Sequence, residues 1–259
     1  MASRSRACAI AVALALPTTL SFAAAPASRG AAPFDLSGVW MNDNTLDERM
    51  KREGRKRQTE QELRGAPGAA AETPPLTPRY LAIYERLRAE QAGRAEGTET
   101  CEWPGLPTIM TYPYPFEILT TPGRITFLFE VESQVRRVFL DRKTHLDPDD
   151  LDPSYNGDSI GFWSGKTLII DTIGFNTRRT VRGLPHSEQM HMIERITPVD
   201  NNTIKDEITI TDPEAFTRPV VISVQYARRP DWRIREYSCA ENNRDAPDAS
   251  GQRVGGVVK

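Results

Sequence analysis

The chain has 259 residues, of which 39% are hydrophobic and 26% charged, and its formal net charge is −2 at pH 7. A mature chain of this size is long enough for one large β domain or two small ones. No basic stretch is interleaved with aromatic residues, so the composition argues against a nucleic-acid partner.

The N-terminus predicts a secretory signal peptide over residues 1–25. Arg4 and Arg6 supply a positive n-region, residues 7–16 form an apolar run, and residues 23–25 are alanines suited to cleavage. The apolar run is too short to cross a bilayer, and no later run is long enough. We therefore expect a periplasmic or secreted protein with no membrane span.

Cysteine usage is the next indication of the compartment. Cleavage of the signal would remove Cys8 and leave Cys101 and Cys239. In an oxidising compartment this even count predicts one disulfide, which would stabilise the fold by about 4–5 kcal/mol in the chain-entropy model. Two buried free thiols are the alternative.

The first half of the mature chain predicts a strand and then a helical segment. Residues 26–42 hold the expected first strand, at 35–40. Residues 43–100 are rich in Arg, Glu, Gln, Ala and Pro and predict a charged helical arm or insertion. Its helix is expected to begin at Thr77-Pro78, because Thr suits the N-cap and Pro the first turn.

From Phe116 onward the pattern is that of β-strands. Turns are expected at residues 121–124, 164–165 and 200–202, and the last strand at residues 231–239. Strands at this spacing predict a closed barrel or a sandwich over residues 101–243, followed by a flexible tail at 244–259.

Period-two alternation assigns four charged side chains to apolar strand faces. A buried carboxylate must be paired or neutralised, and desolvation raises its pKa towards the range of a general acid or base. A buried arginine–carboxylate network that only closes the barrel is the alternative. The four residues are Glu194 and Asp171 as proton carriers, Arg137 as an anion stabiliser, and Glu236 as a further lining residue.

The histidines predict no metal site by their spacing, since HSEQMH lacks the separation of a helical two-histidine pair and no HExxH is present. His186 follows a proline at a loop–strand junction and is a candidate proton shuttle, or else a surface or cap histidine. The acidic run at 147–158 departs from a calcium loop, because Leu151 and Asp152 stand where an oxygen ligand and a glycine belong. We expect a solvent-exposed acidic loop there, and no cofactor motif is present.

The segments GDSIGFWSGKTLIIDT, PHSEQMHMIERI, TITDPEAF and EYSCAENN resemble a family of uncharacterised secreted bacterial proteins. The resemblance covers residues 101–243 and implies export and a lipocalin-like antiparallel β-barrel. Family members often carry His where this chain has Asp158, so no histidine role is carried over to that position. The resemblance implies no particular activity.

Together these patterns predict an exported barrel that holds a small, largely apolar, aromatic or terpenoid-like ligand. Trp163 and Tyr155 are the candidate apolar walls. Cofactor-free acid–base chemistry of a lyase, isomerase or hydratase is the first interpretation. A non-catalytic ligand carrier and a structural envelope protein are the alternatives.

Overall fold

The computed structural model describes residues 33–42, 74–92 and 103–238, and the structural statements below concern these residues. The predicted signal peptide, the tail at 244–259 and both cysteines of the predicted disulfide, Cys101 and Cys239, lie outside them.

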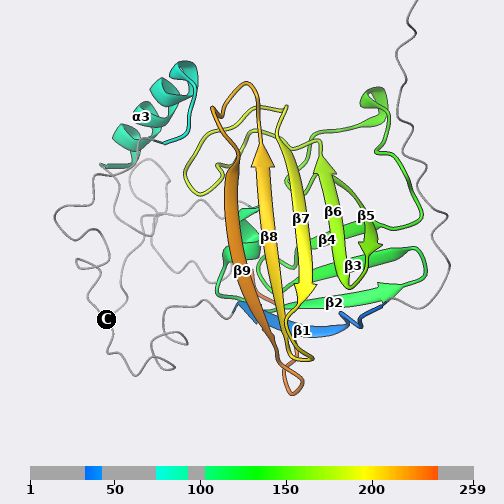
Figure 1. The fold of residues 1–259 in the computed structure, drawn as a ribbon. Coiled ribbons are helices and arrows are strands. Elements are labelled where there is room, and N and C mark those ends of the chain that lie inside the picture. Colours follow the sequence, from blue (N-terminus) through cyan, green and yellow to red (C-terminus); the bar gives the residue numbers. More distant parts are fainter. Residues whose placement is uncertain (1–32, 43–73, 93–102, 239–259) are drawn as a thin grey trace, which may run out of the picture. The chain divides into compact units, whose positions relative to one another are not determined.

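Nine strands form a closed barrel in which they follow one another in chain order and β9 closes against β1 (Figure 1). The predicted lipocalin-like antiparallel barrel with a helical insertion is confirmed. The strands are β1 Gly38–Asn42, β2 Phe116–Thr121, β3 Arg124–Phe129, β4 Val135–Phe139, β5 Asp158–Ser164, β6 Thr167–Ile173, β7 His191–Pro198, β8 Thr203–Thr211 and β9 Val220–Arg228.

One pair of neighbouring strands, β4 and β5, is parallel, and every other pair is antiparallel. An odd number of strands requires this, because strict up–down alternation cannot close around nine members. Parallel strands also need a long crossover connection, here residues 140–157. The β4–β5 ladder pairs only Val138 with Ser159 and Phe139 with Ile160, whereas β5 and β6 pair along seven residues.

The tight turns follow the sequence prediction. Gly123 and Gly165 have φ of +76° and +58°, in the left-handed region that glycine adopts without steric cost. Each lies in a two-residue connection, between β2 and β3 and between β5 and β6.

The α-helix α3, Pro78–Ala92, lies within the predicted insertion and begins at the predicted proline. The Thr77 hydroxyl donates to the carbonyl oxygen of Glu214 at 2.9 Å. Tyr80 is buried in the core, and Arg79 forms an ion pair with Glu214 at 2.6 Å. The first turn of α3 is therefore fastened to the segment that follows β8.

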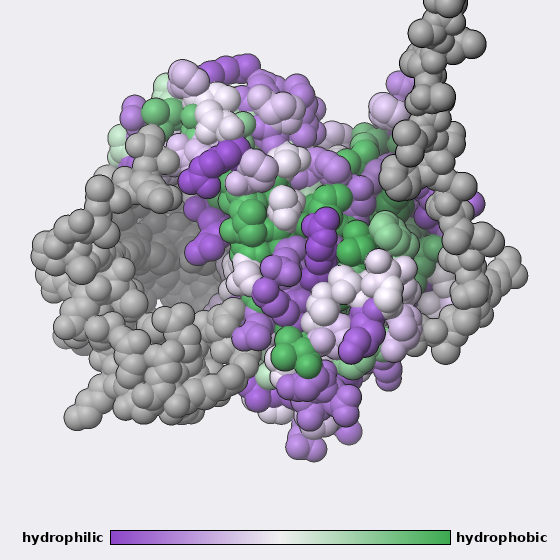
Figure 2. All heavy atoms as spheres, in the orientation of Figure 1, coloured by the Kyte–Doolittle hydropathy of each residue, from purple (hydrophilic) through white to green (hydrophobic). Residues whose placement is uncertain are grey.

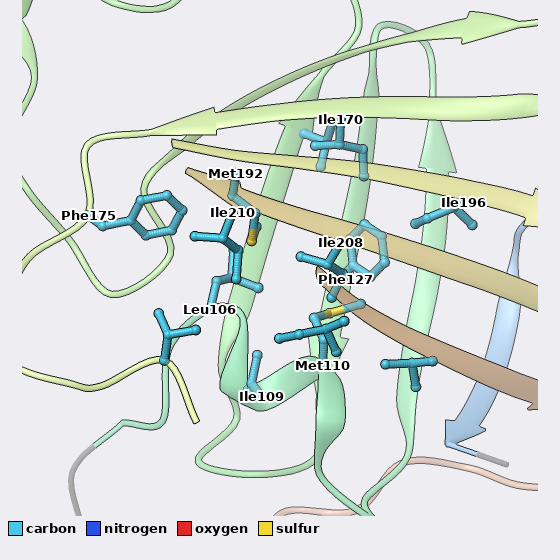
Figure 3. Packing of buried hydrophobic residues seen from close by; sticks show 14 of the residues in the cluster. Leu106, Ile109, Met110, Phe127, Ile170, Phe175, Met192, Ile196, Ile208 and Ile210 are labelled. Atoms are coloured by element: carbon cyan, nitrogen blue, oxygen red, sulfur yellow. The ribbon is translucent and has the colours of Figure 1, made fainter. Parts of the chain in front are cut away.

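Apolar side chains fill the interior of the barrel. Two 3₁₀-helices lie in the connections, η1 Thr108–Thr111 and η2 Pro148–Asp150, and η1 buries Ile109 and Met110. The Tyr226 hydroxyl donates to the Met110 carbonyl at 2.8 Å and so holds η1 against β9. Figure 3 shows that these residues share one core with side chains from β3, β6, β7 and β8, the labelled members being Leu106, Ile109, Met110, Phe127, Ile170, Phe175, Met192, Ile196, Ile208 and Ile210.

The predicted last strand at residues 231–239 is wrong for the described part, residues 231–238. Since β9 pairs with β1, the barrel is already closed before Pro230, and only an isolated bridge joins Tyr237 to Val131. Over the barrel wall, Figure 2 shows hydrophobic and hydrophilic residues intermixed. Among the described helices, none has the length and apolar character required to cross a membrane.

Candidate functional site

A pocket of about 350 Å³ lies beside the short β4–β5 seam. We call it the seam pocket. Its lining comes from β4, from the start of β5, from the residues just before β5, and from one side chain that precedes η1. These residues are Trp103, Val135, Arg136, Arg137, Phe139, Ser154, Tyr155, Asn156, Gly157, Asp158 and Ser159.

Aromatic side chains form much of the lining. The rings of Trp103 and Tyr155 have centroids 6.1 Å apart and are tilted by 49°. The Tyr155 carbonyl accepts a hydrogen bond from the Leu106 amide at 2.9 Å, which fixes the crossover against the chain before η1. Phe139 contributes a third ring and carries the Arg142 guanidinium 4.2 Å from its centroid. Such rings favour a flat, largely apolar ligand.

Two polar groups of the lining residues have no partner among the described residues. The side-chain amide of Asn156 donates to the Val135 carbonyl at 3.3 Å, which fixes its orientation, and its Oδ1 is buried without a hydrogen-bond partner in the described chain. Arg137 is exposed, and its guanidinium forms no ion pair with any described residue.

Behind the seam pocket, a polar network crosses the barrel interior. Both carboxylate oxygens of Glu194 accept from Arg136, one of them at 2.8 Å. The same guanidinium donates to Ser159 Oγ at 3.3 Å and to Thr172 Oγ1 at 3.1 Å. The side chains of Arg136 and Glu194 are 1% and 0% exposed, so each ion depends on the other for compensation.

Asp206 on β8 adds a second acid to this interior. Its side chain is fully buried, and neither oxygen has a hydrogen-bond partner in the described chain. Register places it opposite Ile196, next to Glu194 along β7. Burial, and then the negative charge of Glu194, raise the pKa of Asp206 well above its ordinary value, so the group holds its proton more strongly. Burial likewise raises the pKa of the Tyr226 hydroxyl, with the charge of Asp206 second.

On the outer face, carboxylates and histidines form a continuous chain that reaches the seam pocket. His145 Nδ1 lies 2.9 Å from Asp158 Oδ2, and His145 Nε2 lies 3.0 Å from Asp171 Oδ1. His191 Nε2 lies 2.7 Å from the same Asp171 oxygen. The exposed fraction of the side chains falls from 40% at His191 to 8% at Asp158. We call these four residues the outer chain.

His145 is the bridging residue of the outer chain. Its two ring nitrogens face carboxylate oxygens of different strands, Asp158 on β5 and Asp171 on β6. Burial opposes ionisation of Asp158, but hydrogen bonds from Arg142, His145 and the Leu146 amide outweigh it and lower the pKa of Asp158. The outer chain therefore fastens the crossover at His145 to β5 and β6.

The described residues form no site for a metal ion. Among the described residues, no three His, Cys, Asp or Glu side chains are placed to hold a metal ion together. In the acidic run, Asp147 Oδ1 accepts from the Asp149 amide at 3.1 Å and caps η2.

The interior assignment of Glu194 agrees with the structure, and those of Arg137 and Asp171 are wrong. On β4 it is Arg136 and Val138 that point inward, so Arg137 lies on the outer face, where it lines the seam pocket. On β6 the inward residues are even-numbered, and Asp171 lies outside within the outer chain. Both strands carry apolar side chains on both faces, so alternation alone did not identify the inner one.

The other candidates are dispersed. Tyr155 lines the seam pocket as an aromatic wall. Trp163 packs against the core and is not among the lining residues, and Glu236 is exposed outside any strand, so its assignment to a buried face is wrong. His186 is buried, with Nδ1 2.9 Å from the Ser187 carbonyl oxygen. Asp212 accepts from the Ser187 amide at 2.6 Å, which makes this segment a well-anchored loop.

Sequence reasoning missed several residues of the site. Arg136 shares a face with Val138, which is a signal that could have identified it. Asp158 lies within the hairpin motif, 13 positions after His145, but only the crossover brings the two together. No sequence pattern indicated Trp103, Asn156 or Asp206 as site residues.

Comparison with known proteins gives no assignment. No protein-family model matches the chain, and no curated protein is significantly similar to it.

Proposed function

We propose that this protein is exported and binds a small aromatic molecule in the seam pocket. The observation that carries the proposal is the lining itself, in which Trp103, Tyr155 and Phe139 are among the residues around a space of about 350 Å³. This volume is at the small end of the roughly 300–1,000 Å³ typical of ligand sites. The apolar filling of the barrel centre favours the seam over the interior as the binding place.

Export is supported by the positive n-region, the apolar run and the alanines at 23–25. Intact-mass analysis of periplasmic material should find a chain that begins between Ala24 and Arg29. A mass that retains Met1 or Ala2 in that fraction would refute export with cleavage.

Ligand binding is tested with a panel of single-ring aromatic acids, phenols and cyclic monoterpenes, titrated by calorimetry. Tyr155→Ala removes an aromatic wall but keeps the backbone carbonyl that binds Leu106, so weaker binding with an unchanged melt is expected. Trp103→Ala should also weaken binding. Trp232→Ala is the matched control, because both tryptophans are 46% exposed and only Trp103 lines the seam pocket. Equal effects of the two tryptophan changes would contradict the proposal.

A second candidate function is cofactor-free acid–base chemistry of a lyase, isomerase or hydratase on the bound ligand. It is favoured by one observation, that Asp158 both lines the seam pocket and binds His145. Under this function, His145→Gln would lower turnover by on the order of a hundredfold or more, well beyond any loss of ligand affinity that release of the crossover causes. Binding without turnover in the unmodified protein would instead favour the carrier.

A further inference from the structure

The middle of the crossover is fastened to the barrel around one side chain. Among residues 143–150, His145 is the one residue that is not exposed. Within the described chain, the hydrogen bonds that join this stretch to the strands all end on Asp158 of β5 or Asp171 of β6. We propose that His145 is a pH-sensitive latch, whose cationic imidazole fastens the crossover to both strands and whose neutral imidazole releases it from one of them.

The geometry of the latch follows from the two ring nitrogens of His145. Nδ1 lies 2.9 Å from Asp158 Oδ2, and Nε2 lies 3.0 Å from Asp171 Oδ1. A cationic imidazole has an N–H donor at both nitrogens, whereas a neutral imidazole has one donor and one acceptor. Loss of the proton would therefore place a ring lone pair against a carboxylate oxygen in one of the two contacts, and that contact would become repulsive.

Charged and titratable groups reach His145 from three strands and from the crossover itself. Asp158 comes from β5 and Asp171 from β6, and β7 contributes His191, whose Nε2 lies 2.7 Å from the same Asp171 oxygen. Within the crossover, Arg142 donates to the other oxygen of Asp158. His191 and Arg142 each contact one carboxylate, so of these groups only His145 connects the crossover to both acids.

The contact with Asp171 is the weaker side of the latch. Burial opposes ionisation of Asp158, but hydrogen bonds from Arg142, His145 and the Leu146 amide lower the pKa of that carboxyl. Asp158 is therefore a charged acceptor over the whole range in which an imidazole titrates. The side chain of Asp171 is 33% exposed against 8% for Asp158, so the neutral imidazole should keep Asp158 and release Asp171.

The latch should be closed at acidic pH and open at alkaline pH. The proton on His145 stabilises the fastened crossover, so the fastening is complete below about pH 6.5, the ordinary pKa of an imidazole, and is lost as the pH rises further. The bistable element is the stretch of residues 143–150, and the charge on one imidazole biases it.

Release of the latch would reach the seam pocket at one wall. Tyr155 and Asn156 belong to the crossover and line the pocket, as does Asp158. This end of the crossover has further anchors, since the Ser154 amide donates to the Gly174 carbonyl at 3.0 Å. We therefore expect ligand affinity to fall only about threefold between acidic and alkaline pH. This effect on affinity rests on the proposed function, whereas the latch itself does not.

The test is ¹³Cα NMR relaxation of the full chain without ligand, at about pH 6 and about pH 9. Order parameters of residues 143–150 should fall from about 0.85 towards about 0.6, with the same midpoint as the titration of the His145 ring followed by its ¹⁵N shifts. Asp206 affects the stability of the whole barrel, so the fall must be absent from β8 to count as release of the latch.

Three variants distinguish a latch from a merely structural histidine. His145→Gln should give low order parameters in residues 143–150 at both pH values. Asp171→Asn should give high ones at both, because the asparagine NH₂ group can donate to the neutral imidazole. His191→Gln is the matched control, since His191 contacts the same Asp171 oxygen without touching the crossover, and should retain the pH dependence.

The outcomes separate the latch from the proposed function. Order parameters in residues 143–150 that stay constant while the His145 ring titrates would overturn the latch, as would a pH dependence that persists unchanged in Asp171→Asn. Benzoate titrated by calorimetry at the same two pH values tests the pocket wall, and equal affinities beside a moving crossover would overturn that link alone. Failure of the whole ligand panel to bind would overturn the proposed function and leave the latch intact.

Discussion

Arg136 and Glu194 form a bidentate ion pair inside the barrel, between strands that are not neighbours. The guanidinium reaches from β4 past Ser159 on β5 and Thr172 on β6, and donates to both on its way to β7. The pair therefore connects β4, on one side of the short β4–β5 seam, with β7 on the other side. This geometry favours a stabilising role for Glu194 over a catalytic one.

Replacement of Glu194 by Gln should lower the free energy of unfolding by about 3–5 kcal/mol, because it leaves the Arg136 charge buried without its counter-ion. Urea unfolding measures this directly. Glu207→Gln on the exposed face of β8 is the control and should change little. The double variant Arg136→Met/Glu194→Leu should recover much of the loss. An unchanged unfolding curve for Glu194→Gln would contradict the structural role.

Asp206 should make the stability of the barrel depend on pH. Its folded-state pKa is raised above 3.8, so its contribution to stability is fully present below that value and is lost as the pH rises through the folded-state pKa. Over that range the chain should lose up to about 1.4 kcal/mol per pH unit relative to Asp206→Asn. Asp231→Asn, at an exposed position, is the control. A difference between wild type and Asp206→Asn that stays constant with pH would argue against a buried proton.

Asp158 should show the opposite dependence on pH. Its folded-state pKa is lowered below 3.8, so its contribution is present above 3.8 and is lost as the pH falls through the folded-state pKa. Asp158→Asn should cost about 2 kcal/mol at neutral pH, with a smaller difference in acid. His145→Gln should speed hydrogen exchange in residues 140–157, because it releases the crossover from β5 and β6. Unchanged exchange in that segment would show that the outer chain does not fasten it.

Gly157 is held by close packing as well as by its backbone conformation. Its φ is +61°, and a Cβ there would lie 2.4 Å from the Ile173 carbonyl oxygen and 2.9 Å from Thr172 Cγ2. Gly165 is a matched control, with φ of +58° and no atom within 4 Å of the corresponding position. Replacement of either glycine by Ala should lower the free energy of unfolding by roughly 1–2 kcal/mol, because of the left-handed backbone conformation. Gly157→Ala should lower it further and weaken ligand binding, because the added Cβ would clash with its neighbours. Equal losses of stability in the two variants would contradict a steric contribution at Gly157.

Much of the fold could be predicted from local patterns. The two turn glycines, Gly123 and Gly165, and the proline at the start of α3 are short-range signals, and the structure places turns and helix where they indicate. The extra strand at 231–239 was predicted because alternation continues there, but closure of β9 against β1 is a long-range event that no local pattern carries.

The candidate site was harder to predict, for a physical reason. Glu194 was placed inward because Met190, Met192 and Ile196 make one face of its strand clearly more apolar. Asp171 lies on β6, which is apolar on both faces, so its orientation depends on the register with β5 and β7. The outer chain and the seam pocket also need the crossover of residues 140–157, which brings distant residues together. Pairs such as His145 with Asp158 are therefore a product of topology.

The seam pocket, and not the barrel interior, is the proposed ligand site. The most direct test is the amide and indole NMR spectrum of the ¹⁵N-labelled full chain during titration with 4-hydroxybenzoate, a single-ring aromatic acid. Binding in the seam pocket should give the largest chemical-shift changes at residues 135–139 and 154–159 and at the indole N–H of Trp103. Chemical-shift changes confined to residues 192–196 and 204–210, whose alternate side chains face the barrel interior, with no change at the seam residues, would contradict binding in the seam pocket.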